Sequence, residues 1–173
     1  SYFALEGDAG ALPLAERIVK DLDGKSFSID ARDKALYHAA ACIASNCLVS
    51  LIHFATGLYS RFGLSRREAF EALFPLIRGT IRNISQVGPA PALTGPVSRG
   101  DSPTLAGHLE VLKEGDPLEL DLYRTLCLYT IRVALEKGSI NPAQALELES
   151  LFKPYEEFES GSAMVRSQFL SPA

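Results

Sequence analysis

A stripe of polar side chains on an otherwise apolar helix holds the residues most able to do chemistry. Residues 32–62 follow a helical pattern, and the stretch from Ala39 to Ala55 is apolar nearly all round, as in a helix buried on most sides. With 3.6 residues per turn, five side chains of this helix fall within about 40° of one line. They are Lys34, His38, Cys42, Ser45 and Thr56, with His53 and Asn46 slightly further round.

The first two members of the stripe, Lys34 and His38, are one turn apart. Histidine is the side chain whose ordinary pKa best suits proton exchange near neutrality. A hydrogen-bonding imidazole beside a cation suits a carbonyl or imine substrate. We therefore expect Lys34 and His38 to be catalytic, with Ser45 and Asn46 positioning the substrate. In the alternative, structural interpretation, the small residues admit close helix packing and a backbone carbonyl satisfies His38.

The segment TGPVSRGD at 94–101 is a second concentration of polar groups. The polar stripe could line a cleft, and Thr94 and Arg99 are candidates for binding polar groups of a substrate in that cleft. Arg99-Gly100-Asp101 also matches an integrin-binding tripeptide, although three residues recur often by chance. A structural interpretation places Asp101 near the start of a helix at 103–114, where its charge favours the helix dipole, and has Arg99 contact a carboxylate or another helix.

Signatures of phosphate and metal binding are absent from the sequence. GDAG at 7–10 lacks the G-x-G-x-x-G pattern, and Gly24-Lys25-Ser26 has Val19 where a P-loop requires glycine. His53 and His108 have no acid or cysteine nearby at ligand spacing, so we predict no metal site. We therefore expect that this chain alone could not hold a dinucleotide.

The elements that position these residues begin with a β-α-β unit. Strands are expected at 2–7 and 25–30, and an amphipathic helix at 12–23. Parallel strands need more strands and helices around them, so this unit should be the edge of a larger α/β domain. The only methionine is Met164 and the chain starts at Ser1, which suggests the C-terminal piece of a longer protein.

Helices dominate the remainder of the sequence. Ser65 and Glu68 form a capping box for a helix at 66–87, and the Pro- and Gly-rich stretch 88–101 is expected to be a loop. Three further helices have an N-cap residue followed by proline, and a tail without periodicity follows Pro154. Their start signals are Ser102-Pro103, Asp116-Pro117 and Asn141-Pro142.

Composition narrows the class of protein and its compartment. The 173 residues carry a net charge of −4, which gives no basic field to attract nucleic acid. The three cysteines are odd in number and lie in apolar runs, which favours a reducing cytoplasm over a disulfide scaffold. No apolar run reaches the roughly 18 residues of a membrane span, so no membrane is expected as a partner.

Several motifs, taken in order, resemble the second half of a known group of proteins. They are FALEGD (3–8), DKALYHAAACIASN (33–46), Gly88-Pro89, ALTGPVSRGD (92–101) and His108-Leu109. The group comprises Rossmann-like proteins, described as NADP-dependent oxidoreductases, with a helical C-terminal domain of unassigned function. It is similar to deazaflavin-dependent NADP reductases and to ketopantoate reductase, and the resemblance covers roughly residues 1–137.

The resemblance implies a Rossmann domain that binds NADP or NAD, here lost except for its last β-α-β, and a helical domain that dimerises. In ketopantoate reductase and related hydroxyacid dehydrogenases, a Lys and an Asn one turn apart polarise or protonate the substrate oxygen. Lys34 and His38 match that spacing, so the Asn is replaced. Ala31-Arg32-Asp33 replaces the glycines that precede the Lys in those dehydrogenases, and Asn46 could take part of the role.

The expected fold is mainly α: a multi-helix dimerisation domain, like the C-terminal domain of 6-phosphogluconate dehydrogenase, preceded by a β-α-β remnant of a Rossmann domain. Residues 1–30 would be the remnant, 31–154 the substrate and dimerisation domain, and 155–173 a mobile tail. The expected function is the substrate-facing, dimerising half of an NAD(P)-dependent oxidoreductase for a small carbonyl or imine compound. The alternative is a non-catalytic dimerisation or ligand-sensing module, and extracellular adhesion is a distant third.

Overall fold

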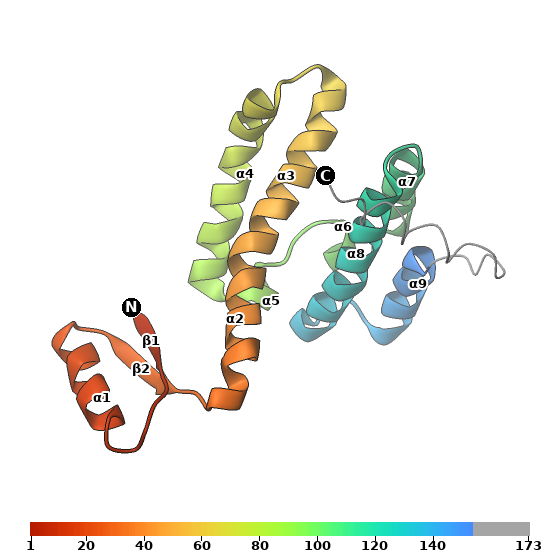
Figure 1. Cartoon of the computed structure of the whole chain (residues 1–173). Coiled ribbons are helices and arrows are strands. Elements are labelled where there is room, and N and C mark those ends of the chain that lie inside the picture. Colours follow the sequence, from red (N-terminus) through yellow and green to blue (C-terminus); the bar gives the residue numbers. More distant parts are fainter. Residues whose placement is uncertain (154–173) are drawn as a thin grey trace, which may run out of the picture. The chain divides into compact units, whose positions relative to one another are not determined.

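The computed structural model describes residues 1–153, so the predicted tail 155–173 lies outside the described residues. The chain is mainly helical, with one small parallel sheet near its N-terminus (Figure 1). It divides into two compact units, Ser1–Leu73 and the residues from Phe74 onward. The division falls inside helix α4, Arg66–Val87. We describe each unit by itself, and the predicted domain boundaries near residues 30 and 154 stay predictions.

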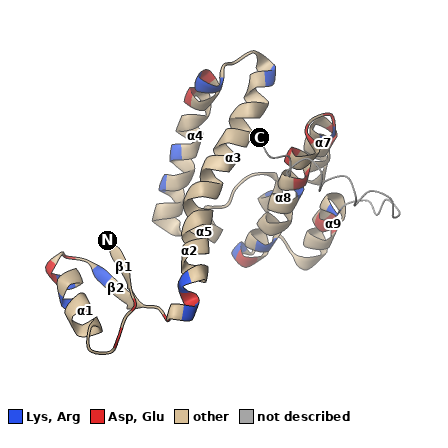
Figure 2. Ribbon diagram, in the orientation of Figure 1, with Lys and Arg blue, Asp and Glu red and all other residues tan. Residues whose placement is uncertain are grey.

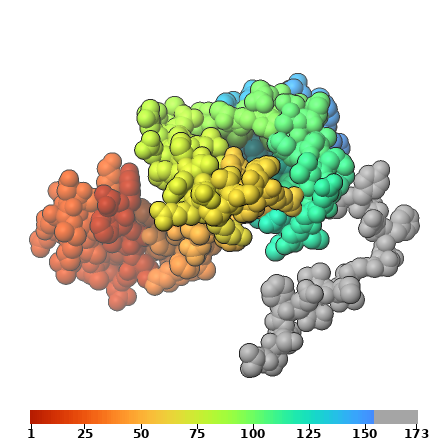
Figure 3. Space-filling model, turned by 90° about the horizontal axis from the view of Figure 1, so that it is seen from above, coloured from red at the N-terminus to blue at the C-terminus, as the bar shows by residue number. Residues whose placement is uncertain are grey.

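The first unit opens with the predicted β-α-β arrangement. Strand β1 (Tyr2–Leu5), helix α1 (Leu12–Asp21) and strand β2 (Lys25–Ser28) follow in order, and the strands pair in parallel with Tyr2 opposite Lys25. Gly24 is required before β2, because a Cβ there would lie 2.7 Å from the ring of Phe3. Both strands are shorter than predicted. In the space-filling view this segment, in red, continues into the orange start of the next helix (Figure 3).

A continuous helix covers Ala31–Phe62, close to the predicted 32–62. It begins with the 3-10 turn η1 (Ala31–Asp33), followed by α2 (Lys34–Cys42) and a π-helical turn, η2 (Ile43–Cys47). Helix α3 (Leu48–Tyr59) and the 3-10 turn η3 (Ser60–Phe62) complete it. The expectation that its middle is buried is wrong within these residues, since Ile43 and Val49 are 65% and 66% exposed. The protein therefore presents a long apolar helix to its surroundings.

Charged side chains lie only near the two ends of this helix (Figure 2). Residues 35–60 contain no Asp, Glu, Lys or Arg. An 18-residue window of the helix has a mean hydropathy of 1.6, enough by length and composition alone to cross a membrane. This finding differs from the expectation that no apolar stretch is long enough to span a membrane. Apolar helices in the cores of soluble proteins meet the same criteria of length and hydropathy.

Helix α4 starts where its capping box predicts. The Ser65 hydroxyl donates to the Glu68 carboxylate at 2.6 Å and accepts from the Glu68 amide at 3.3 Å. Hydrogen bonds from Ser65 lower the pKa of the Glu68 carboxyl. Gly63 turns the chain between η3 and α4 with a φ of +82°, where glycine is favoured. The guanidinium of Arg66 donates to the backbone oxygen of His53, which joins the start of α4 to α3.

The stretch 88–101, predicted as a loop, contains two short helices, α5 (Pro89–Ala92) and α6 (Pro96–Arg99). Each begins with proline directly after a glycine, Gly88 or Gly95, whose φ is near +90°. Proline is favoured at the first position of a helix because its missing N–H would have no partner there. Composition predicted a loop because four-residue helices are too short to show a periodicity.

The second unit is completed by three longer helices, α7 (Ser102–Lys113), α8 (Pro117–Lys137) and α9 (Pro142–Phe152). Asp116 and Asn141 cap α8 and α9 as predicted. The apolar core of the unit comes from these helices together with α6. Its buried members are Val97, Leu105, Leu109, Cys127, Ile131, Ala134, Ile140, Ala145, Leu148 and Phe152.

Candidate functional site

The first predicted site residue, Lys34, lies where the β-α-β segment passes into the long helix. Glu6 follows β1 directly, and its carboxylate lies 2.5 Å from the Lys34 amine. Because β1 and β2 are parallel, Glu6 and the residues after β2 lie at the same edge of the sheet. The rings of Phe27 in β2 and Tyr37 in α2 are 6.2 Å apart and also tie the start of the helix to the sheet. Lys34 is therefore positioned at the carboxyl edge of the parallel strands.

His38 lies one turn further along α2 and is exposed. Its Nε2 is 3.5 Å from the Sγ of Cys42, one more turn along. The structural interpretation, in which a backbone carbonyl satisfies His38, finds no such bond among residues 1–153. No protein group among these residues bonds Nδ1, which leaves that nitrogen accessible to a small molecule. Lys34, His38 and Cys42 thus lie on one side of the helix, as their helical spacing predicted.

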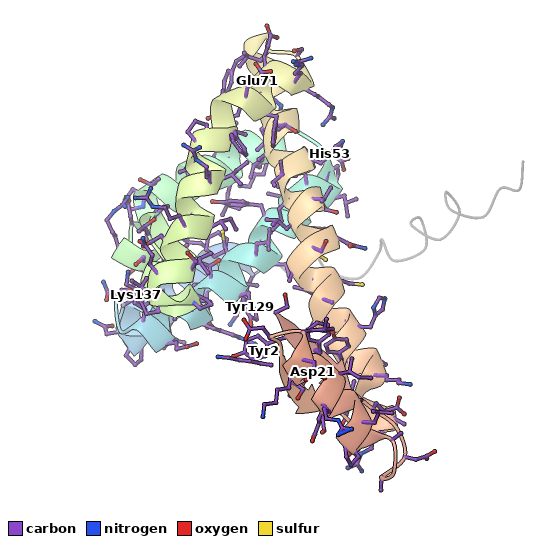
Figure 4. All side chains as sticks on the ribbon, turned by 90° about the vertical axis from the view of Figure 1, so that its left-hand side faces the viewer. Tyr2, Asp21, His53, Glu71, Tyr129 and Lys137 are labelled. Carbon is purple, nitrogen blue, oxygen red and sulfur yellow. The ribbon has the colours of Figure 1, made fainter. Side chains whose placement is uncertain are left out.

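Ser45 and Asn46 lie within the π-helical turn Ile43–Cys47, and both are exposed. A π-helical turn accommodates one extra residue, so the helix beyond it is rotated by about 100° relative to a regular α-helix. The predicted stripe therefore does not continue to Thr56. That residue is buried, and its hydroxyl donates to the backbone oxygen of His53 at 2.9 Å. The side chain of His53 lies on the outside of α3 (Figure 4). π-Helical turns occur frequently at functional sites.

The other two predicted substrate-binding residues, Thr94 and Arg99, belong to the second unit. Thr94 is exposed between α5 and α6, and Arg99 ends α6. The Arg99 guanidinium lies 3.5 Å from the carboxylate of Asp101, which also caps α7 by accepting from the amide and hydroxyl of Thr104. Hydrogen bonds from Thr104, and secondarily Arg99, lower the pKa of Asp101. The structural interpretation of Arg-Gly-Asp is confirmed.

A polar cluster in the second unit combines the exposed His108, the half-buried Tyr123 and the buried Cys127. The hydroxyl of Tyr123 is 2.7 Å from Nδ1 of His108, and Cys127 is buried one turn beyond Tyr123. Burial raises the pKa of both the Tyr123 phenol and the Cys127 thiol. Both groups therefore stay protonated at neutral pH. In the part of the chain that the structure describes, no three His, Cys, Asp or Glu side chains gather as metal ligands would.

Sequence reasoning missed two features, one in each unit. The first is the ion pair between Glu6 and Lys34. An acidic residue directly after a predicted strand could have marked Glu6 as a candidate, but its pairing with Lys34 depends on the fold. The second feature is an open cavity of about 470 Å³ in the second unit. It is lined by Pro75, Leu76, Gly79, Thr80, Asn83, Ile84, Pro89, Ala92, Leu93 and Thr94. Of the predicted site residues, Thr94 lines it.

Comparisons with known proteins identify a family of unknown function and a similar solved structure. A family model described as a domain of unknown function (DUF2520) matches residues 1–130. The solved structure of protein TM1727 from Thermotoga maritima is similar, with a TM-score of 0.73 and 30% sequence identity. The alignment covers 79% of this chain and 54% of that one, so the chain spans about half the length of this relative. A search of curated proteins found no match.

Proposed function

The chain belongs to the DUF2520 family, and we propose that it is the substrate-facing and dimerising half of an NAD(P)-dependent oxidoreductase. The substrate would be a small carbonyl or imine compound. The observation that carries this proposal is the placement of Lys34 and His38 on successive turns, at the carboxyl edge of two parallel strands. In open α/β sheets, ligands bind outside the carboxyl ends of the strands.

Each proposed residue has a chemical role that its position permits. The Lys34 amine would hydrogen-bond the carbonyl oxygen or imine nitrogen, while Glu6 holds that amine in place. His38 would donate the proton that completes the new O–H or N–H bond. Exposed Ser45 and Asn46 would position the substrate. NADPH or NADH, held by a domain outside this sequence, would supply the hydride to the substrate carbon.

The turn after β1 does not fit a dinucleotide. Pyrophosphate binding needs free backbone N–H groups at a helix N-terminus. Here the N–H groups of Ala11 and Leu12 already donate to the Asp8 carbonyl, at 2.8 and 3.2 Å, and the turn carries the acidic side chain of Asp8. The turn between β1 and α1, residues 6–11, therefore gives the cofactor no phosphate site.

We predict that the chain 1–173 alone binds neither NADH nor NADPH appreciably. Isothermal titration calorimetry with each cofactor measures this directly, and we expect no heat of binding beyond dilution. A dissociation constant in the low micromolar range would place a nucleotide site within these residues. It would contradict the proposal that a domain outside this sequence holds the cofactor.

A second prediction concerns the exposed apolar helix, which we propose is covered by a second copy of the chain. Ile43 and Val49 present large apolar side chains in a stretch without charge, and a symmetric dimer is the commonest way to bury such a surface. Sedimentation at micromolar concentration should show a dimer. Val49→Glu should shift it toward monomer, whereas the control Leu118→Glu, at a site 72% exposed on α8, should not.

Two outcomes would contradict this prediction. One is a wild-type monomer under these conditions. The other is co-sedimentation of the wild-type chain with phosphatidylcholine vesicles, lost in Val49→Glu, which would assign the apolar helix to a membrane.

A non-catalytic module is the second candidate function, and two contacts favour it. The Lys34 amine is already engaged by Glu6, and His38 already contacts the Cys42 thiol. Both contacts could serve to order α2 in a dimerisation or ligand-sensing domain. The two candidates differ in what His38→Gln does, because only a catalytic His38 requires a proton that glutamine cannot supply.

A further inference from the structure

A groove along the second half of α4 combines an apolar cavity with two arginines. One side of the helix contributes Leu76 and Ile84 to the cavity of about 470 Å³, whose opposite wall is α5 with Leu93 and Thr94. A second hollow adjoins the first along α4 and shares Pro75, Gly79 and Asn83 with it. The second hollow also contains Arg78, Arg82 and Gln86. The cavity volume lies within the range of about 300–1,000 Å³ that is usual for small-molecule sites.

The wall formed by α5 is fixed by two hydrogen bonds. The Asn83 amide donates to the Ala92 backbone oxygen at 3.2 Å. Lys137, the last residue of α8 (labelled in Figure 4), donates to the Leu93 backbone oxygen at 2.6 Å. Ala92 and Leu93 are consecutive, so α4 and α8 both hold the C-terminal end of α5. The cavity is a formed feature of the unit.

The two arginines have no acidic partner in the part of the chain that the structure covers. No ion pair among residues 1–153 includes Arg78 or Arg82, and α4 carries no Asp or Glu after Glu71. The guanidinium of Arg78 lies over the ring of Phe74, with its Cζ 6.0 Å from the ring centre. Like charges four residues apart destabilise a helix. The helix dipole favours cations only within the last turn, which Arg78 does not reach.

Gly79 keeps the groove open. It lies inside α4, where glycine is unfavourable relative to alanine, and it lines both hollows. A Cβ built at Gly79 would have no heavy atom within 4 Å apart from the helix's own backbone and its chain neighbours. A larger side chain would therefore extend into free space of the groove without a clash.

We propose that this groove binds a small organic anion. A phosphate or carboxylate group would lie between Arg78 and Arg82, and an apolar group would enter the cavity beside Leu76, Ile84 and Leu93. Guanidinium groups pair with either oxyanion through charge-assisted hydrogen bonds. The proposal goes beyond the reductase function, because it requires neither a cofactor nor turnover and uses neither Lys34 nor His38.

The test uses phenyl phosphate as the probe, with inorganic phosphate and phenol as its two halves. Calorimetry on the chain 1–173 should show phenyl phosphate binding about tenfold or more tightly than either half. Gly79→Leu should abolish binding by filling the groove. The matched control is Gly107→Leu on α7, a helical glycine whose Cβ also meets nothing within 4 Å, and it should leave binding unchanged.

Arg78→Gln and Arg82→Gln should each weaken phenyl phosphate by about tenfold, with little effect on phenol. Benzoate should compete with phenyl phosphate if the site accepts any small oxyanion, and failure to compete would restrict the site to phosphate esters within the same proposal. Binding that survives in Gly79→Leu, or that is equally tight for phenol, would overturn the proposal. The proposal would also be overturned if the wild-type chain, shown to be folded by its cooperative unfolding, did not bind phenyl phosphate.

Discussion

Replacing His38 with glutamine is expected to lower turnover by about 10²–10⁴-fold, the usual contribution of a general acid or base. The assay needs a protein in which a nucleotide-binding domain precedes residue 1, and it follows oxidation of NADPH in the presence of substrate. Glutamine keeps a donor, an acceptor and similar bulk but cannot transfer the proton. Because His38 is exposed, the melting temperature should change little.

His53→Gln is the matched control for this prediction. His53 is also exposed and lies on the same continuous helix, but it follows the π-helical turn. Its turnover and melting temperature should both equal those of the wild type. If His38→Gln instead lowers stability and turnover together, His38 is a structural residue. Equal turnover in His38→Gln and wild type would remove this residue from the reaction.

Replacing Phe152 with alanine is expected to destabilise the second unit by about 3–5 kcal/mol. Phe152 is completely buried at the end of α9, and its ring meets that of Tyr123 edge to face at 6.3 Å between centres. Removing the ring leaves a cavity among α7, α8 and α9, which the surrounding core can fill only in part.

Urea unfolding, followed by helical circular dichroism, measures this loss. Leu146→Ala serves as the control, because Leu146 lies on the same helix but is 66% exposed, and its cost should stay within about 0.5 kcal/mol. Similar losses in the two variants would show that Phe152 is not the core residue described here.

Local chemistry made much of the fold predictable. The capping pairs at Ser65-Glu68, Asp116-Pro117 and Asn141-Pro142 all start helices where the sequence placed them, because each depends only on residues within one turn. At α7 the prediction is wrong by one residue, since Asp101 caps the helix and Ser102 is its first residue. The Ser102 hydroxyl donates to Glu147 of α9, a contact that no local pattern could indicate.

The candidate site was predictable only as far as the regular helix extends. Lys34, His38 and Cys42 share a face because they lie within α2. The π-helical turn at Ile43–Cys47 has no sequence signal, so regular helical spacing wrongly extended the stripe to Thr56. Glu6 and Lys34 are 28 positions apart, and their ion pair depends on how β1 meets the start of α2. The groove on α4 depends likewise on the position of α5, in a stretch predicted to be a loop.

Substrate-dependent NADPH oxidation tests the proposed reductase role most directly. The protein should carry a nucleotide-binding domain before residue 1, and the compounds offered should be small 2-oxo acids and cyclic imines. We predict that at least one compound accelerates the loss of reduced-nicotinamide absorbance, and that Lys34→Met and His38→Gln each suppress the acceleration. A protein that binds NADPH but oxidises it no faster with any of these compounds would contradict the reductase proposal and favour the non-catalytic module.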